Sequence, residues 1–302
     1  MIQDKLVFIM ILTALRKLII LSILVLLVMA AGRIWYISRD GFSVNRIHFP
    51  LSKESGGDEA KENEISPLLS APYRYLGRGR QCYVFASADD RYVIKIPRFD
   101  RYTLPFFWRA MPDFCHSIKH SIWAGRQDRL RFTLQSFRIA AQDLPEETAV
   151  VYLHLHQTRS LPEHFEIRDR LNRSFDLNLN RTPFILQKKR SLMMPLVLKA
   201  LSNNDRTVAQ EMLSAFLDVI EARARKGIFN RDPSFLKNFG WDGSKSTQID
   251  IGSFWRKSNL TPDAAYWLSL REGSARVQEW LAETDQEMLD YYNSQLEMRL
   301  NR

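Results

Sequence analysis

Cysteine is scarce in this chain of 302 residues, which contains only Cys82 and Cys115. Two cysteines provide neither the number nor the spacing of a disulfide framework or a zinc site. The sequence also contains no internal repeat, helix-turn-helix, zinc finger or aromatic RNA-binding signature, so we expect no nucleic-acid partner. These absences favour a folded part that works in a reducing compartment.

The composition is otherwise that of an ordinary globular protein, with 45% hydrophobic and 25% charged residues. The chain is long enough for one large domain or two small ones. Its formal charge is +9 and its isoelectric point is near 9.6. This excess of basic residues favours an anionic partner such as a nucleotide or a membrane surface, but it does not specify a fold.

The first forty residues contain one long apolar run. Leu18 to Gly32 carries no charge, but as a helix it would span only about 22 Å of the roughly 30 Å hydrocarbon core. Arg16 and Lys17 before it, and Trp35 and Tyr36 after it, suit the two interfaces of a bilayer. We therefore expect a single transmembrane anchor in residues 1–40. A cleaved signal peptide is the alternative, because basic, apolar and small residues follow one another in the right order.

The rest of the chain changes character twice. Residues 41–70 include a polar, acidic stretch without aromatics, which predicts a flexible linker. Residues 71–190 contain strand-like runs separated by turn residues, followed by a long helical stretch and further strands. Residues 191–302 are mainly helical, with one helix closing at Gly227. Strands first and helices later predict an α+β fold.

A short loop with two glycines lies between the first two predicted strands. Gly77 and Gly79 precede Val84, and Lys95 lies on the next strand. Such a loop lets the backbone approach phosphates closely, and the lysine can reach the same phosphates as a point charge. By themselves these residues also fit an ordinary hairpin and a lysine that extends to solvent.

Three polar residues follow an amphipathic helix about 140 positions later. Asp232 and Asn238 lie in one loop, and a short strand leads from there to Asp250. Phosphoryl transfer from a magnesium nucleotide requires a carboxylate near the acceptor hydroxyl, together with oxygen ligands for the cation. A turn, a loop cap and a strand end would explain each residue alone.

Together these motifs resemble the protein kinase-like superfamily, as a divergent bacterial-type member. The glycine motif of that family matches Gly77, Gly79 and Val84, with Cys82 at the third glycine, and its lysine strand matches Lys95. Its catalytic loop matches Asn230-Arg231-Asp232 and its metal loop matches Asp250-Ile251-Gly252, with an interval of 18 residues (250 − 232). The resemblance covers about residues 73–254.

The resemblance implies a two-lobed kinase-like fold preceded by one transmembrane helix. The N-lobe would be an antiparallel sheet in residues 71–190, and residues 191–302 would form a reduced helical C-lobe. ATP and Mg²⁺ would be the cofactors. Gly77, Gly79, Val84 and Lys95 would bind the nucleotide, and Asn238 with Asp250 would bind the metal.

Asp232 and Lys95 would be the catalytic residues. The acceptor would be a protein, a lipid-linked sugar or a small molecule with a hydroxyl group. Because ATP is cytoplasmic, the globular domain would face the cytoplasm. An adenine would lie near Gln187 and Lys188, at the predicted hinge.

Several departures from the family pattern keep a second interpretation open. Asn230 replaces a histidine, and Asn238 follows Asp232 by six residues where five are usual. The predicted helix supplies no glutamate for Lys95, leaving as candidates Asp128, Asp143, Glu146 and Glu147. No A-P-E-like segment follows the metal loop. A pseudokinase that acts as a membrane-tethered scaffold is therefore the alternative to an active enzyme.

Overall fold

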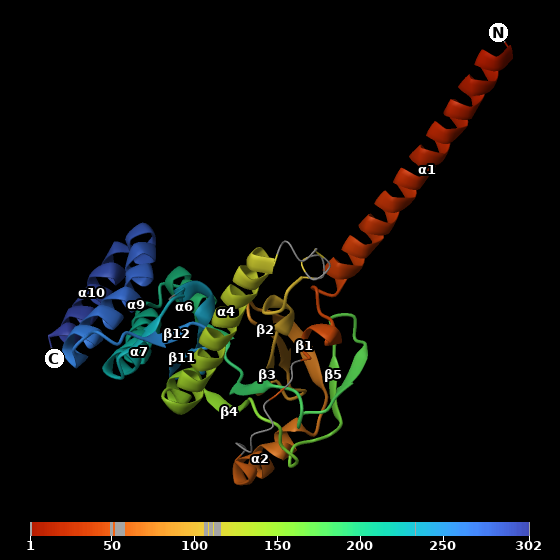
Figure 1. The fold of residues 1–302 in the computed structure, drawn as a ribbon. Helices are drawn as coiled ribbons and strands as arrows, with labels where there is room; N and C mark the ends of the chain where they lie inside the picture. The colour runs from red at the N-terminus through yellow and green to blue at the C-terminus, as the bar shows by residue number, and fades with distance from the viewer. Residues whose placement is uncertain are drawn as a thin grey trace.

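A computed structural model of the chain describes residues 2–48, 51, 58–105, 108, 111, 116–232 and 234–301. The protein is α+β, with a seven-stranded mixed sheet, a helical part and one long N-terminal helix. Figure 1 shows this helix projecting away from the rest of the chain, with the sheet at its base and the C-terminal helices beyond the sheet.

The projecting helix α1 (Ile2–Ser38) contains a segment that is long and apolar enough to cross a membrane. This segment, Leu15–Ser38, has 24 residues and a mean hydropathy of 2.5, and its apolar window is 0% buried against the rest of the chain. An exposed helix of this kind is not a core helix of a soluble domain. A membrane anchor and a signal sequence both satisfy the same criteria.

The sheet is built from seven strands: β1 (Tyr73–Arg78), β2 (Cys82–Ala86), β3 (Tyr92–Pro97), β4 (Val150–His154), β5 (Phe165–Arg168), β6 (Ser174–Leu177) and β7 (Phe184–Lys188). Their order is β4-β7-β3-β2-β1-β5-β6. The predicted hairpins are confirmed, including the turn at Asp90, whose φ of 61° lies in the left-handed region. The expectation of a wholly antiparallel sheet is wrong at one place, because β5 pairs with β1 in parallel.

The segment expected to be a flexible linker is folded in its described part. It contains three elements: η1 (Val44–Arg46), α2 (Glu59–Ile65) and η2 (Ser66–Leu69). Phe42 and Ile65 are each only 1% exposed in the core beneath the sheet. Glu62 is also buried, and its carboxylate accepts a hydrogen bond of 2.7 Å from the Tyr152 hydroxyl. The linker prediction is therefore corrected for the described residues 41–48, 51 and 58–70, where a few apolar residues hold the segment against the sheet.

Helix α4 (His116–Gln142) occupies the other face of the sheet, after η3 (Phe99–Arg101) and before α5 (Pro145–Thr148). Its predicted apolar spacing is confirmed, since Phe137 and Ala140 are buried. They pack in one cluster with Ile185 of β7 and with Ile251 and Phe254. Helix α4 therefore packs between the sheet and the segment around Asp250.

The remaining helices are α6 (Met193–Ser202), α7 (Arg206–Arg225), α8 (Phe235–Asn238), α9 (Pro262–Thr284) and α10 (Gln286–Leu300). Asp205 caps α7 and Thr261 caps α9, while Gly227, with a φ of 63°, follows the end of α7. Five short strands accompany them: β8 (Ser191–Leu192), β9 (Ile228–Asn230), β10 (Phe239–Trp241), β11 (Ser246–Gln248) and β12 (Phe254–Arg256). The pairing of β9 with β12 brings the loop after Asn230 beside the loop after Asp250.

Candidate functional site

The glycine loop between β1 and β2 is tight and is held by its carbonyl groups. The amide of Gly79 donates a hydrogen bond of 2.9 Å to the carbonyl of Cys82, and Gly77 lies opposite Val84 in the ladder. A Cβ atom at Gly77 would meet no described atom within 4 Å. Packing within the described chain therefore does not require this glycine, which lies where the register of the ladder shifts between Tyr75 and Gly77.

Two arginines after β3 bind the outer side of this loop. The amide of Arg98 donates a hydrogen bond of 2.7 Å to the carbonyl of Gln81. The guanidinium of Arg101 donates one of 2.8 Å to the carbonyl of Arg80. These bonds to the Gln81 and Arg80 carbonyl groups hold the loop against the segment after β3.

The side chain of Gln81 connects the glycine loop to the predicted metal loop. Its Nε2 donates a hydrogen bond of 2.9 Å to the carbonyl of Gly252. A Cβ atom at Gly252 would lie 1.8 Å from Gln81 Oε1, so this contact requires a glycine. The glycine loop is thus closed onto the Asp250 segment by a residue that the family motif leaves unspecified.

Lys95 on β3 points at the same segment. Its Nζ donates a hydrogen bond of 2.5 Å to the carbonyl of Ile249. Burial lowers the pKa of Lys95, and the nearby carboxylate of Asp250 opposes that shift. The neighbouring Cys82 is a buried thiol whose pKa is raised to about 12, mainly by burial, so it is not a thiolate nucleophile.

None of the proposed carboxylates reaches Lys95. Asp128 pairs with Arg131, Asp143 with Arg256 and Glu147 with Lys226. Glu146 lies in a separate cavity and forms no ion pair with a described residue. Within the described ranges, Lys95 has no ion pair to any carboxylate of α4 or α5. The departure noted in the sequence therefore persists in three dimensions.

Ser136 of α4 makes the contact between this helix and the metal loop. It is fully buried, its Oγ donates a hydrogen bond of 2.6 Å to the carbonyl of Ile251, and the same Oγ accepts one of 2.7 Å from the amide of Phe254. These two bonds connect α4 to the Asp250-Ile-Gly segment and to Phe254, two residues after it. Sequence reasoning missed Ser136, although a serine between the buried positions Thr133 and Ala140 was a usable signal.

Asn230 and Asp232 of the catalytic-loop motif form a compact network with Ser253. Asn230 Oδ1 accepts a hydrogen bond of 3.0 Å from the amide of Asp232, and Asn230 Nδ2 donates one of 3.0 Å to the Asp232 carbonyl. Ser253 Oγ donates to Asn230 Oδ1 at 2.5 Å. The residue that replaces the family's histidine therefore holds both the Asp232 loop and the end of the metal loop.

Asn238 completes this network despite its extra residue of spacing. Its Nδ2 donates a hydrogen bond of 2.9 Å to the Asp232 carbonyl, and its own carbonyl accepts one of 2.7 Å from the amide of Ile249. Among the described residues, none donates to Asn238 Oδ1. This oxygen and the Asp250 carboxylate, which accepts from the Gly252 amide at 3.2 Å, are hard donors of the kind that Mg²⁺ prefers.

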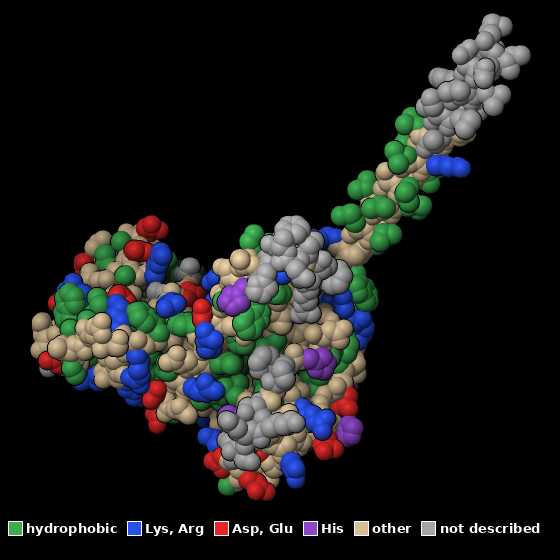
Figure 2. All heavy atoms as spheres, in the orientation of Figure 1, with side chains coloured by type: hydrophobic (Ala, Val, Ile, Leu, Met, Phe, Trp, Pro, Cys, Tyr) green, Lys and Arg blue, Asp and Glu red, His purple; other side chains and the backbone are tan. Residues whose placement is uncertain are grey.

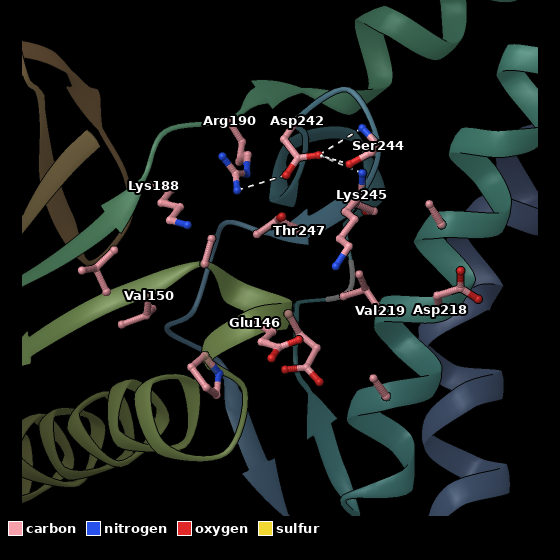
Figure 3. A pocket seen from close by; sticks show the side chains of 17 residues that line it. Glu146, Val150, Lys188, Arg190, Asp218, Val219, Asp242, Ser244, Lys245 and Thr247 are labelled. Carbon is pink, nitrogen blue, oxygen red and sulfur yellow. Dashed lines mark hydrogen bonds and ion pairs between the residues drawn. The ribbon is translucent and has the colours of Figure 1, made fainter. Parts of the chain in front are cut away.

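Two cavities lie near these loops. A cavity of about 530 Å³ borders Asp232 and is lined also by Arg231, Arg276, Glu279, Trp280 and Glu283. The Asp232 side chain is exposed there and forms no ion pair with a described residue. A second cavity of about 860 Å³ lies between α5, β4, α7 and the β10–β11 turn (Figure 3). It is lined by Lys188 of the predicted hinge, but by none of the predicted catalytic, phosphate-binding or metal-binding residues.

The predicted hinge lies between that second cavity and the sheet. Lys188 and Arg190 line the cavity, and Arg190 pairs with Asp242 at 3.1 Å. Gln187 is 1% exposed, and its Nε2 donates a hydrogen bond of 2.5 Å to the carbonyl of Thr148. The Gln187 side chain is thus engaged with α5, and the adenine position expected near Gln187 and Lys188 stays a prediction.

No family model and no curated protein matches the chain. Among solved structures it is similar to WbdD: a crystal structure matches with a TM-score of 0.35 and 13% identity over 74% of this chain and 44% of that chain. A structure described as the bifunctional kinase-methyltransferase WbdD gives a TM-score of 0.34 at 13% identity, over 74% and 43%. A co-crystal structure of WbdD and a kinase inhibitor gives 0.36 at 13% identity, over 75% and 45%.

This chain therefore spans less than half the length of the WbdD chains that it matches. At these TM-scores the likeness is remote, and it establishes neither a shared family nor a shared activity.

Proposed function

We propose that this protein is a membrane-anchored, two-lobed kinase-like enzyme that transfers the terminal phosphoryl group of Mg-ATP to a hydroxyl acceptor. One observation carries the proposal. A continuous series of hydrogen bonds joins Lys95 to Ile249, Ile249 to Asn238, and Asn238 to Asp232. These hydrogen bonds connect the residues that would bind phosphate, hold the metal and act as the base.

Each residue has a role set by its chemistry. Lys95 is a partly buried cation near the Asp250 carboxylate, and among the described residues it has no ion pair with α4 or α5, so phosphate oxygens would bind it. Gly77, Gly79 and Val84 would cover the nucleotide. Asn238 and Asp250 would hold Mg²⁺, which would neutralise charge on the transferred phosphoryl group. Asp232, exposed beside a cavity, would orient the acceptor hydroxyl and accept its proton.

The membrane part of the proposal rests on α1. A retained anchor would tether the domain, and the use of ATP would require that domain to lie in the cytoplasm. The cavity beside Asp232 has room for a polar acceptor such as a sugar hydroxyl or a protein side chain. The class of acceptor is left open among a protein, a lipid-linked sugar and a small molecule.

A pseudokinase scaffold is the second candidate. Two observations favour it: among the described residues no carboxylate of α4 or α5 pairs with Lys95, and Gln81 links the glycine loop to Gly252. A closed loop of this kind must open before a nucleotide can enter.

Transfer of labelled phosphate separates the two functions. Full-length protein in lipid vesicles is incubated with Mg-ATP labelled at the terminal phosphate, and label is measured in protein, in lipid and as free phosphate. We expect Asp232→Asn to lower the total transfer by about 10²–10⁴-fold, the usual contribution of a general base. The matched control Asp290→Asn, on the exposed side of α10, should have no effect.

ATP binding is measured on the same samples. If wild type binds ATP but transfers no more label than Asp232→Asn, the enzyme is excluded and the scaffold remains. If neither protein binds ATP, the ATP-dependent enzyme is likewise excluded and a scaffold that works without nucleotide remains.

A further inference from the structure

The β5–β6 hairpin of the sheet contributes no residue to the candidate site. Strands β4 and β7 are antiparallel neighbours, and His154 at the end of β4 lies opposite Phe184 at the start of β7. A short turn could join them. Instead the chain crosses to the far edge of the sheet, where β5 and β6 extend it beyond β1. This excursion places the β5–β6 turn at the base of α1 (Figure 1).

The turn is rigid and presents basic and apolar side chains. The buried carboxylate of Asp169 accepts hydrogen bonds from the amides of Leu171 and Arg173 at 2.9 and 3.0 Å, and from Arg173 Nε at 2.9 Å. Leu171 is nevertheless 42% exposed. Arg170 is exposed and pairs with no described carboxylate.

Arg173 connects this turn to the end of α1. Its guanidinium lies over the ring of Trp35 at 4.9 Å, and the guanidinium of Arg39 lies over the same ring at 4.7 Å. Trp35 is still 48% exposed and belongs to the apolar segment of α1. We call Trp35, Arg39, Arg170, Leu171 and Arg173 the juxtamembrane collar. Figure 2 shows basic side chains gathered where α1 meets the globular part.

Hydrogen bonds of the described residues at the end of α1 join the collar directly to the sheet. The amide of Gly41 donates to the carbonyl of Tyr36 at 2.8 Å, and the carbonyl of Gly41 accepts a bond of 2.7 Å from the Tyr83 hydroxyl. Gly41 has a φ of 66°, and a Cβ atom there would lie 2.5 Å from the guanidinium of Arg78. Phe42 then enters the aromatic core. The direction of α1 relative to the sheet is therefore fixed.

We infer that the juxtamembrane collar docks on an anionic lipid surface, with Leu171 at headgroup depth and Arg170 contacting lipid phosphates. Tryptophan and arginine are the residues that favour the membrane interface, and clustered cations beside a membrane helix are attracted to anionic lipids. The inference rests on the proposed anchoring by α1. It assigns a role to the β5–β6 hairpin, which orients the domain on the bilayer.

The test places a fluorescent label on the turn of the full-length protein. Leu171→Cys is made in a Cys115→Ser background, since Cys82 is buried, and the labelled protein is reconstituted into vesicles with nitroxide-labelled headgroups. The control label is attached through Ala60→Cys, at an exposed position on α2 at the opposite end of the sheet part from α1 (Figure 1). The vesicles contain phosphatidylcholine alone or with phosphatidylserine.

We expect quenching of the label at position 171, stronger with phosphatidylserine, and no quenching of the label at position 60. Arg170→Glu should remove the effect of phosphatidylserine, whereas Arg138→Glu, which makes the same charge change on the exposed face of α4, should preserve it. If the extent of quenching is the same with and without phosphatidylserine, and is unchanged in Arg170→Glu, the recognition of anionic lipid would be overturned.

Vesicle flotation separates docking from anchoring. If the protein floats with the vesicles but the label on the β5–β6 turn is not quenched, docking is overturned and anchoring is supported. Protein that does not float would overturn both. The fluorescence of this label could instead change with the density of protein in the vesicles and not with the nitroxide. That result would overturn lipid docking and indicate that a second copy of the chain covers the turn.

Discussion

The two halves of the candidate site are built in different ways. On the helical side, hydrogen bonds between residues at most six positions apart (238 − 232) join Asn230 and Asn238 to Asp232. On the sheet side, Lys95 and Gln81 reach residues 154 and 171 positions away. The helical half is therefore a local motif, and the sheet half exists only when the whole chain is folded.

This difference bears on function. The helical half leaves Asp232 exposed beside a cavity, as a base requires. In the sheet half, Gln81 ties the glycine loop to Gly252. Changes in the sheet half should therefore alter nucleotide binding, and changes in the helical half should alter turnover.

The largest effect is expected when the pH is lowered, which should reduce the free energy of unfolding of the part that contains the seven-stranded sheet. His154 on β4 is 1% exposed, and burial lowers its pKa from 6.5 to about 4. Between these values the unfolded chain binds a proton that the folded chain does not. Stability is thus present above pH 6.5 and is lost as the pH falls toward 4, by about 3 kcal/mol. Urea unfolding in detergent at several pH values measures this loss.

His154→Phe should flatten that pH dependence, because the new side chain does not titrate. His164 is exposed, and its hydrogen bond with Asp176 raises its pKa, so His164→Gln is the control that should keep the acid loss. An unchanged pH profile in His154→Phe would contradict the assignment.

The next effect concerns the bond between α4 and the metal loop. Ser136→Ala leaves the buried amide of Phe254 without its partner, which should lower stability by about 1–3 kcal/mol and weaken ATP binding. Ser274→Ala is a matched control, since Ser274 is equally buried but its Oγ donates within α9, to Leu270. Equal ATP affinities in the two variants would show that Ser136 has no part in the site.

A change in the helical half should separate turnover from binding. Asn230→Ala removes both bonds to Asp232, so we expect phosphoryl transfer to fall by about tenfold, equivalent to about 1.4 kcal/mol. ATP affinity should fall by much less, although the variant also loses the bond from Ser253. Label transfer and equilibrium binding are measured on the same preparation. A loss of ATP affinity as large as the loss of turnover would contradict the division between the two halves.

The smallest effect is expected at the closed glycine loop. Gln81→Ala removes one hydrogen bond of about 0.5–1.5 kcal/mol, so ATP should bind about two- to tenfold more tightly if the loop must open. Gln135→Ala, on the exposed face of α4, is the control. Weaker binding in Gln81→Ala would mean that Gln81 contacts the nucleotide.

Sequence patterns predicted what depends on neighbouring residues. The alternation in β1 to β3, the apolar spacing of α4 and the stop at Gly227 all follow from local chemistry. The contacts of Ser136 and Gln81 do not, because each joins segments more than 100 positions apart. The acidic linker was predicted from composition, which does not reveal that isolated residues such as Phe42 and Ile65 are buried.

Mg-dependent ATP binding is the decisive test of the proposed Mg-ATP site at Lys95 and Asp250. Thermal unfolding of the full-length protein in detergent is followed with ATP, with and without Mg²⁺. At about a hundredfold excess over Kd, binding should stabilise the native state by about 2.7 kcal/mol. We expect ATP with Mg²⁺ to raise the unfolding temperature of wild type. Lys95→Ala and Asp250→Ala should abolish this shift, and Lys199→Ala, at an exposed lysine of α6, should retain it. No shift in folded, nucleotide-free wild-type protein, or the same shift in all four proteins, would contradict the proposed site.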